Sequence, residues 1–279
     1  MSEIKCDIKK IKAIPAIDMH CHLNFGHPGD SNVYTTGNKE YVRRTFGESA
    51  PLVITNKLKV YDAFQEYLDI TAKEANIEYT FTSSFAAVLH ASDVIDGNEY
   101  LLDLVKKRDN LFQWAVVDPR EEYSFKQARD ILESGKGVGL KVVPGYHNYE
   151  INDYGDKIFK FAAEYETNIL LHPVPDRPIV TFADKYPELN FITAHMCTSH
   201  ISCCKHKNIY TDTSGGSSLG NNIIEAASTW IPDHVMFGTD TNHAGAFRGR
   251  IEYALMSDEI KYKMLRGTAE KLFAKYLNK

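Results

Sequence analysis

The chain has 279 residues, of which 43% are hydrophobic and 25% charged, and its formal net charge is -5 at pH 7. This composition is typical of a soluble globular protein, and the charge gives no electrostatic reason to expect binding to nucleic acid or to an acidic membrane surface. The N-terminal residues lack the apolar core of a signal peptide, and no run reaches the ~18 apolar residues that a membrane span needs. We therefore expect a cytoplasmic protein whose partner is a small molecule; the sequence leaves its oligomeric state undetermined.

The first predicted element is a strand at residues 16–22 that carries His20 and His22 two positions apart. Because side chains alternate along a strand, Asp18 should share a face with both histidines. Two imidazoles on one face provide half of a metal site, although such a pair also occurs on an ordinary polar strand face. A long polar loop follows at residues 24–56, and its length makes it a candidate lid.

Helices and strands then alternate along the chain. The predicted helices are 57–76, 98–108, 124–133, 153–166, 179–185, 222–229 and 258–277, and the remaining predicted strands are 77–85, 112–117, 138–143, 168–172, 189–195, 208–213 and 235–240. Eight strands separated by helices predict an α/β protein, a (β/α)8 TIM barrel that forms a single domain over residues 1–279. The alternative, an open doubly wound sheet, usually carries a glycine-rich phosphate loop, and neither GxGxxG nor GxxxxGKS occurs in this sequence.

Polar residues stand at the C-terminal ends of the predicted strands, where barrel enzymes carry their chemistry. These residues are His20, His22, Lys141, His172, His195, Asp212 and Asp240. Each alone could be an ordinary hydrogen-bonded residue or cap a turn, but together the histidines and Asp240 indicate a metal site. Such ligands favour zinc, with manganese, iron, cobalt and nickel as alternatives. The metal would lower the pKa of a water ligand to ~7 and make that water the nucleophile.

The HxH motif, the two strand-ending histidines and Asp240 resemble the amidohydrolase superfamily of metal-dependent TIM barrels. The segments GLKVVP, LHP, FGTD and LRGTAEKLF, at residues 139–144, 171–173, 237–240 and 265–273, are similar to its amidohydrolase-related branch. That branch includes aminocarboxymuconate-semialdehyde and resorcylate decarboxylases as well as hydrolases.

This resemblance implies that one metal is bound by His20, His22, His172 and Asp240. It implies one of two roles for His195: an action beside a single metal, or binding of a second metal bridged by a carboxylated Lys141. We favour one metal, with two as the alternative.

Asp240 is the best candidate for general base and acid. Asp18 and Asp212 could orient a ligand histidine or form a polar layer in the barrel. Arg248, Arg177 and Tyr146 are candidate substrate contacts on loops at the catalytic face, although the arginines could equally be solvated surface charges.

Our leading hypothesis from the sequence is a zinc-dependent hydrolase of a small cyclic amide, lactone or related carbonyl compound. The alternative is a metal-dependent decarboxylase or hydratase that acts on an unsaturated or aromatic carboxylate. A third hypothesis, a metal-free binding barrel, would require all the candidate ligands to be incidental.

Overall fold

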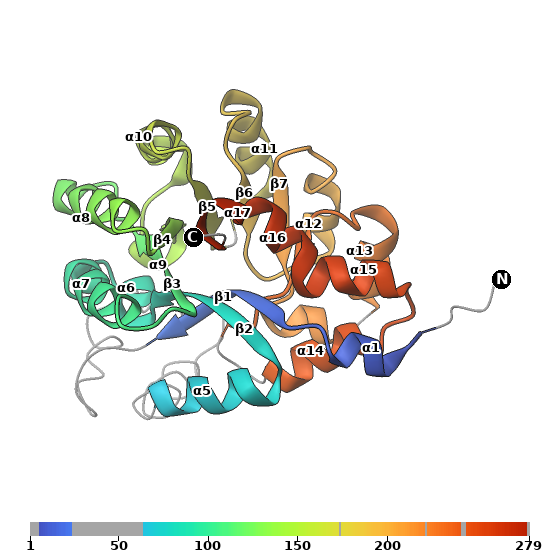
Figure 1. The fold of residues 1–279 in the computed structure, drawn as a ribbon. Coiled ribbons are helices and arrows are strands. Elements are labelled where there is room, and N and C mark those ends of the chain that lie inside the picture. Colours follow the sequence, from blue (N-terminus) through green and yellow to red (C-terminus); the bar gives the residue numbers. More distant parts are fainter. Residues whose placement is uncertain (1–5, 24–63, 173, 221, 241–243, 278–279) are drawn as a thin grey trace, which may run out of the picture.

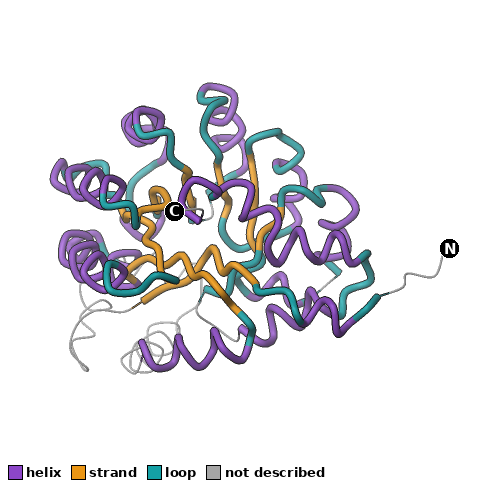
Figure 2. Tube along the Cα trace, in the orientation of Figure 1, coloured by secondary structure: helices purple, strands orange, loops and turns teal. Residues whose placement is uncertain are grey.

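A computed structural model describes residues 6–23, 64–172, 174–220, 222–240 and 244–277 of the chain. The candidate lid at residues 24–56 lies outside these described residues. Eight parallel strands form one sheet in the order β1 to β8, and helices surround it (Figures 1 and 2). The predicted (β/α)8 barrel, a single domain, is therefore confirmed.

The candidate site residues lie either in the second half of a strand, as His20, His22, Lys141 and Asp212 do, or just after the end of one, as His172, His195 and Asp240 do. The bounds of the strands are β1 (Ala16–Leu23), β2 (Ile77–Ser84), β3 (Leu111–Val116), β4 (Gly137–Val142), β5 (Asn168–Leu171), β6 (Phe191–Thr193), β7 (Ile209–Asp212) and β8 (Val235–Met236). Backbone hydrogen bonds also join β1 to the segment after β8, since the amide of Met19 donates to the carbonyl of Phe237. The amides of Thr239 and Asp240 both donate to the carbonyl of His20, so this seam of the barrel holds two candidate ligands together.

Helices follow most strands directly and cover the outside of the barrel. They are α1 (Ile8–Lys12), α5 (Phe64–Glu74), α6 (Phe85–Leu89), η1 (Ala91–Asp93), α7 (Val94–Val105), α8 (Glu122–Glu133), α9 (Pro144–His147), α10 (Ile151–Glu164), α11 (Asp176–Lys185), α12 (Thr198–Cys203), η2 (Gly216–Leu219), α13 (Ile223–Trp230), α14 (Ala244–Glu252), α15 (Asp258–Tyr262), the π-helical turn η3 (Lys263–Gly267), α16 (Thr268–Leu272) and α17 (Ala274–Leu277).

Several helical regions differ from the prediction: the short helices α1, α6 and α9 were not expected, and two larger differences concern the C-terminal helix and α14. The expected single helix at 258–277 contains a π-helical turn and is interrupted at Phe273, whose φ of -110° ends α16. Helix α14 was not predicted, because Gly245, Gly249 and a buried Arg248 obscure the apolar periodicity of its sequence. Tertiary contacts therefore decide the structure of both segments.

Apolar side chains fill the barrel interior at the end where the strands begin. Phe273 packs there with its ring centroid 4.8 Å from that of Phe81 and 5.6 Å from that of Trp114. Lys275 donates to the carbonyl of Glu166, just before β5, so α16 and α17 lie across this end of the barrel (Figure 1, red). Because side chains and helices close the end where the strands begin, a functional site is expected at the other end, where the strands finish.

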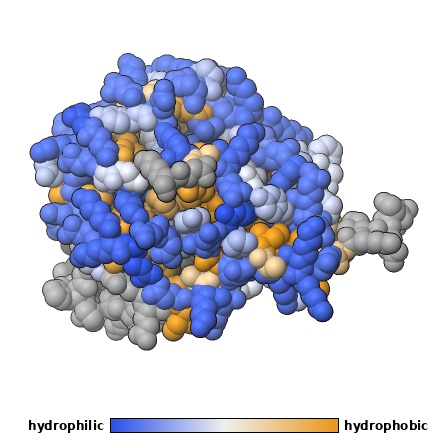
Figure 3. Space-filling model, in the orientation of Figure 1, coloured by the Kyte–Doolittle hydropathy of each residue, from blue (hydrophilic) through white to orange (hydrophobic). Residues whose placement is uncertain are grey.

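Polar side chains predominate on one face of the molecule. The face drawn in Figure 3 is mostly hydrophilic, with small hydrophobic patches between the polar side chains. In the described part of the chain, we find no helix that combines the length and the apolar character needed to cross a bilayer.

Candidate metal centre

Strand β1 directs His20 into the barrel but turns Asp18 outward. The pairing of β1 with β2 is irregular between Asp18 and Cys21, and these two residues line a small cavity together with Leu68 and Thr71 at α5. The prediction that Asp18 shares the face of the two histidines is therefore wrong, because this irregularity interrupts the alternation of side chains.

Asp18 nevertheless supports the centre from the outer side of the strand. Its carboxylate accepts hydrogen bonds from the hydroxyl of Thr239 at 2.6 Å and from the amides of Thr239 and His20 at 3.1 and 3.2 Å. Burial raises the pKa of Asp18 to about 7 despite these bonds. Asp18 thus ties the start of the HxH motif to the residue that precedes Asp240.

His20 is fully buried and is contacted at both ring nitrogens. Its Nδ1 lies 2.9 Å from Oδ2 of Asp212 and 2.9 Å from Oγ of Ser214, while its Nε2 lies 2.9 Å from Nζ of Lys141. Burial, and after it the charge of Lys141, lowers the pKa of His20 well below its usual value. A carboxylate at Nδ1 fixes the proton there and leaves the lone pair of Nε2 for the centre, as in metal-bound histidines. The expectation that Asp212 orients a ligand histidine agrees with this contact.

His22 is held in a comparable way. Its Nδ1 lies 2.8 Å from the hydroxyl of Ser83 at the end of β2, and its Nε2 lies 2.9 Å from Oδ1 of Asp240. Asp240 has a φ of 53°, a left-handed conformation that is uncommon for residues other than glycine. The backbone bond from Asp240 to His20 holds this conformation, and it directs the carboxylate toward both histidines of the motif.

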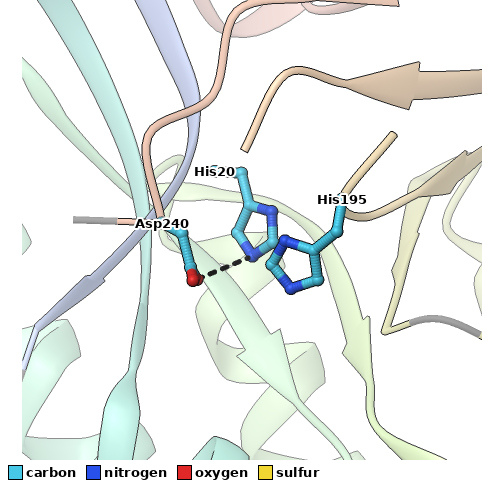
Figure 4. Close-up of side chains that lie close together, drawn as sticks. All are labelled: His20, His195 and Asp240. Atoms are coloured by element: carbon cyan, nitrogen blue, oxygen red, sulfur yellow. Dashed lines mark ion pairs between the residues drawn. The ribbon is translucent and has the colours of Figure 1, made fainter. Parts of the chain in front are cut away.

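His195, at the end of β6, completes the inner group. Single ligand atoms of His20, His195 and Asp240 all lie within 4.8 Å of one another, and Figure 4 shows the three side chains converging on one space. The His195 ring is 5.1 Å from that of His20 and 5.4 Å from that of His172, between centroids. His195 also has a positive φ, 62°. Burial lowers the pKa of both His172 and His195.

Lys141 is buried against His20. Burial lowers the pKa of its amine to about 8, although Asp240 and Asp212 act in the opposite direction. The position on β4 agrees with the predicted placement, and the 2.9 Å contact shows that the amine can reach the atoms of the centre directly.

The substrate contacts predicted from the sequence lie in different surroundings. Tyr146 is buried in α9 with its ring 4.7 Å from that of His172, so it lies beside the centre. Arg177 is exposed in the first turn of α11, after β5.

The prediction that Arg248 binds substrate is wrong. Its guanidinium is buried at the opposite end of the barrel and pairs with Glu252 at 2.7 Å. Its remaining bonds go to backbone carbonyls of the segments that precede β1 and β2, namely those of Ile11, Lys12, Ile14, Ala75 and Asn76. Arg248 therefore holds the base of the barrel together and cannot reach the centre.

Three hydroxyl residues at the site were missed by the sequence analysis. Ser83, Ser214 and Thr239 each bond a candidate ligand or the residue that supports one. The available signal was weak: Ser83 lies near the end of β2, and Ser214 and Thr239 lie in the segments after β7 and β8, where serine and threonine also serve as ordinary turn residues.

The donor set fits a divalent metal ion. The Nδ1 atoms of His20 and His22 are engaged by Asp212 and Ser83, so each ring directs Nε2 toward the space that Asp240 also faces, where Nε2 of His20 contacts the amine of Lys141. Imidazole nitrogens together with one carboxylate suit zinc, manganese, iron and related ions.

Comparisons with known proteins agree with this fold. A family model described as "Amidohydrolase" matches residues 17–275. No curated protein sequence matches the chain significantly.

Several solved structures are similar over nearly the whole chain. The 2,6-dihydroxybenzoate decarboxylase from Rhizobium is 14% identical, with 93% of this chain and 98% of that chain covered and a TM-score of 0.70. A dihydroxybenzoic acid decarboxylase from Polaromonas sp., with bound manganese and the inhibitor 2-nitroresorcinol, is 17% identical over 95% and 97% of the two chains, with a TM-score of 0.69. The 4-oxalomesaconate hydratase from Rhodopseudomonas palustris is 14% identical over 93% and 96%, with a TM-score of 0.60. At these identities, the likeness establishes the fold alone.

Proposed function

Because the chain belongs to the amidohydrolase family, we propose that it is a metal-dependent decarboxylase of an aromatic or unsaturated carboxylate. The observation that carries the proposal is the convergence of His20, His195 and Asp240 at the C-terminal end of the barrel. The choice of reaction is supported by the similar solved structures, several of which are decarboxylases of hydroxylated benzoates. These comparisons favour the alternative of the sequence analysis over its leading hypothesis, a hydrolase.

The proposed ligands of a single metal are His20, His22, His172 and Asp240. Three of the similar structures contain manganese, so manganese stands beside zinc as a candidate. A divalent metal at this position would supply Lewis acidity toward substrate oxygen atoms.

Side chains of the protein would then deliver the proton that the reaction needs. Decarboxylation breaks the bond between the carboxylate carbon and the adjacent carbon, CO2 leaves, and a proton replaces it on that adjacent carbon. Asp240 and His195 face the same space, so either can hold this proton within reach of a substrate there. Arg177 and Tyr146 remain proposed substrate contacts, and the proposed partner is a small molecule in the cytoplasm.

Metal analysis is the first test. We expect about one divalent metal per chain in protein purified without chelator, and His172→Ala should abolish stoichiometric metal while circular dichroism shows a folded protein. Two metals per chain would instead support a carboxylated Lys141 and ligation by His195. No metal, even after reconstitution with zinc, manganese, iron, cobalt or nickel, would refute the proposed centre.

Product analysis then separates the reactions. Protein loaded with Mn²⁺ or Zn²⁺ is incubated with a panel of hydroxybenzoates and a panel of lactones and cyclic amides, and CO2 and ring-opened products are measured. We expect CO2 from the first panel, and Asp240→Asn should reduce turnover by at least ~10²-fold, as is typical of a lost general acid or base. Asp156→Asn, an exposed aspartate paired with Lys185, is the matched control. Turnover of the second panel alone would return the assignment to a hydrolase.

A further inference from the structure

Ser214 lies between two histidines of the centre. It lies two residues after the end of β7, is fully buried, and its Oγ is 2.9 Å from Nδ1 of His20 and 2.9 Å from Nδ1 of His195. Its backbone amide donates to Oδ1 of Asp212 at 2.7 Å. One serine thus contacts Asp212, His20 and His195, which come from three different strands.

The proton on His20 can be assigned from its neighbours. Both oxygens of Asp212 accept hydrogen bonds, Oδ1 from the amide of Ser214 and Oδ2 from Nδ1 of His20. Nδ1 of His20 therefore carries the proton, and Nε2 accepts from the amine of Lys141. The same Nδ1–H faces Oγ of Ser214, so that oxygen serves as an acceptor on this side.

The hydroxyl proton of Ser214 must then point elsewhere. Among the described residues, the other side-chain atom within hydrogen-bonding distance of its Oγ is Nδ1 of His195. A hydroxyl that donates to Nδ1 requires that nitrogen to have a free lone pair, and in a neutral imidazole the proton then resides on Nε2.

Gly215 secures this contact. It has a φ of 81°, and a Cβ at this position would lie 2.9 Å from Cβ and 3.0 Å from Nδ1 of His195. The absence of a side chain lets the loop after β7 approach the imidazole closely enough for the Ser214 bond.

We infer that Ser214 is a positioning residue that fixes the tautomer of His195, so that His195 presents a protonated Nε2 to the centre and donates a hydrogen bond there instead of binding a metal. This inference rests on the proposed function in one respect: it assumes that a metal binds beside His195. The Nε2–H group of His195 would donate to an oxygen acceptor of a bound substrate, such as a carboxylate or phenolate oxygen. The inferred tautomer also favours one bound metal over two, because a protonated Nε2 of His195 cannot act as a metal ligand.

The direct test is ¹⁵N nuclear magnetic resonance of histidine-labelled, metal-free protein, with His195 assigned by comparison with His195→Gln. Long-range ¹H–¹⁵N correlations distinguish the two tautomers, and we expect His195 in the Nε2–H form. A His195 in the Nδ1–H form would overturn the inference without any need for a serine variant. This measurement needs neither metal nor substrate, so its outcome is separate from that of the proposed function.

Variants then test whether Ser214 is responsible. Ser214→Ala should convert His195 to a mixture of tautomers, and Ser214→Thr, which keeps the hydroxyl, should restore the Nε2–H form. Ser218→Ala is the matched control, because Ser218 is buried nearby in η2 and its hydroxyl donates to the carbonyls of Thr213 and Gly215. An unchanged pure Nε2–H form in a folded Ser214→Ala protein would refute the role of Ser214.

The tautomer of His195 in the Zn²⁺-bound protein provides a further test. We expect the His195 Nε2–H form to persist when one Zn²⁺ per chain is bound. Replacement of that proton by Zn²⁺ would show that His195 is a ligand and would overturn the inference, while leaving the proposed metal centre intact.

Discussion

The two ends of the barrel bury cations in opposite ways. At the end where the strands begin, Arg248 pairs with Glu252 and donates to backbone carbonyls from the segments before β1 and β2. At the other end, Lys141 is fully buried, and its amine meets a neutral imidazole nitrogen of His20. Arg248 is surrounded by acceptors that hold it in place, whereas Lys141, whose pKa is lowered to about 8 by burial, lies against a candidate ligand atom, as is typical of a chemical site. The partners of a buried cation therefore indicate its role better than its burial does.

Replacement of Arg248 should have the largest effect. Arg248→Met leaves the buried carboxylate of Glu252 without its partner and removes the guanidinium as a donor to backbone carbonyls before β1 and β2, so we expect a loss of about 3–5 kcal/mol of unfolding free energy. Urea denaturation measures this loss. Arg250→Met, which removes a more exposed pair with Glu225, should lose less than about 1 kcal/mol. Equal losses in the two variants would contradict the contrast between the ends.

Acid should destabilise the protein through His147, which lies in α9 near the catalytic end. Its Nε2 donates to the carbonyl of Ala87 at 2.8 Å, and burial lowers its pKa to about 4. The unfolded chain binds this proton near pH 6.5 and the folded protein does so only near pH 4. Unfolding free energy therefore falls as pH decreases through this window, by up to about 3 kcal/mol.

A variant isolates this contribution from those of the other histidines. His147→Gln keeps a donor for Ala87 but has no titrating group, so its unfolding free energy should decrease less than that of the unmodified protein between pH 7 and pH 4.5. Denaturation curves at the two pH values provide the comparison, and parallel behaviour of both proteins would rule out His147 as the source.

Gly238 tests how tightly the catalytic end is packed. A Cβ at this position would lie 3.0 Å from Cβ of His20 and 3.1 Å from Oδ1 of Asp212. Gly238→Ala should therefore displace the pair that orients His20 and weaken metal affinity by ~10–100-fold, the usual effect of disturbing a residue that supports a ligand. Calorimetric titration with Zn²⁺ measures the change. Gly245→Ala, with open space around the added methyl group, should leave affinity unchanged.

Lys141 should show the smallest effect on stability. Lys141→Met removes a charge that burial disfavours and fills a similar volume, so unfolding free energy should stay the same or rise by up to about 2 kcal/mol. Denaturation of the metal-free variant tests this expectation. A loss as large as that of Arg248→Met would make Lys141 a structural cation and remove the distinction between the two ends.

The barrel and the strand-end residues could be predicted from the sequence because apolar runs that end in a polar residue are a local signal. His172 and His195 are of this kind: the observed strands β5 and β6 end one and two residues before them, at Leu171 and Thr193, and the two rings lie side by side. Asp18 was misassigned, since an irregular pairing with β2 is set by the neighbouring strand and leaves no trace in the alternation.

Two other features depend on contacts between distant segments. Arg248 gains its partners only when α14 packs beside the segments before β1 and β2. Ser214 acts through histidines that are 19 and 194 residues away in the sequence. Neither the arginine nor the serine differs in its local sequence from a surface charge or a turn residue, so only the three-dimensional structure separates these possibilities.

The position of Phe273 has a consequence for the order of events during synthesis. Residues 268–277 leave the ribosome after all eight strands, yet Phe273 packs among the rings of Phe81 and Trp114 from β2 and β3. Until that segment emerges, the apolar interior made by the earliest strands stays open to water. We therefore expect nascent chains arrested before residue 268 to remain protease-sensitive, and the barrel to close only after translation has passed this point.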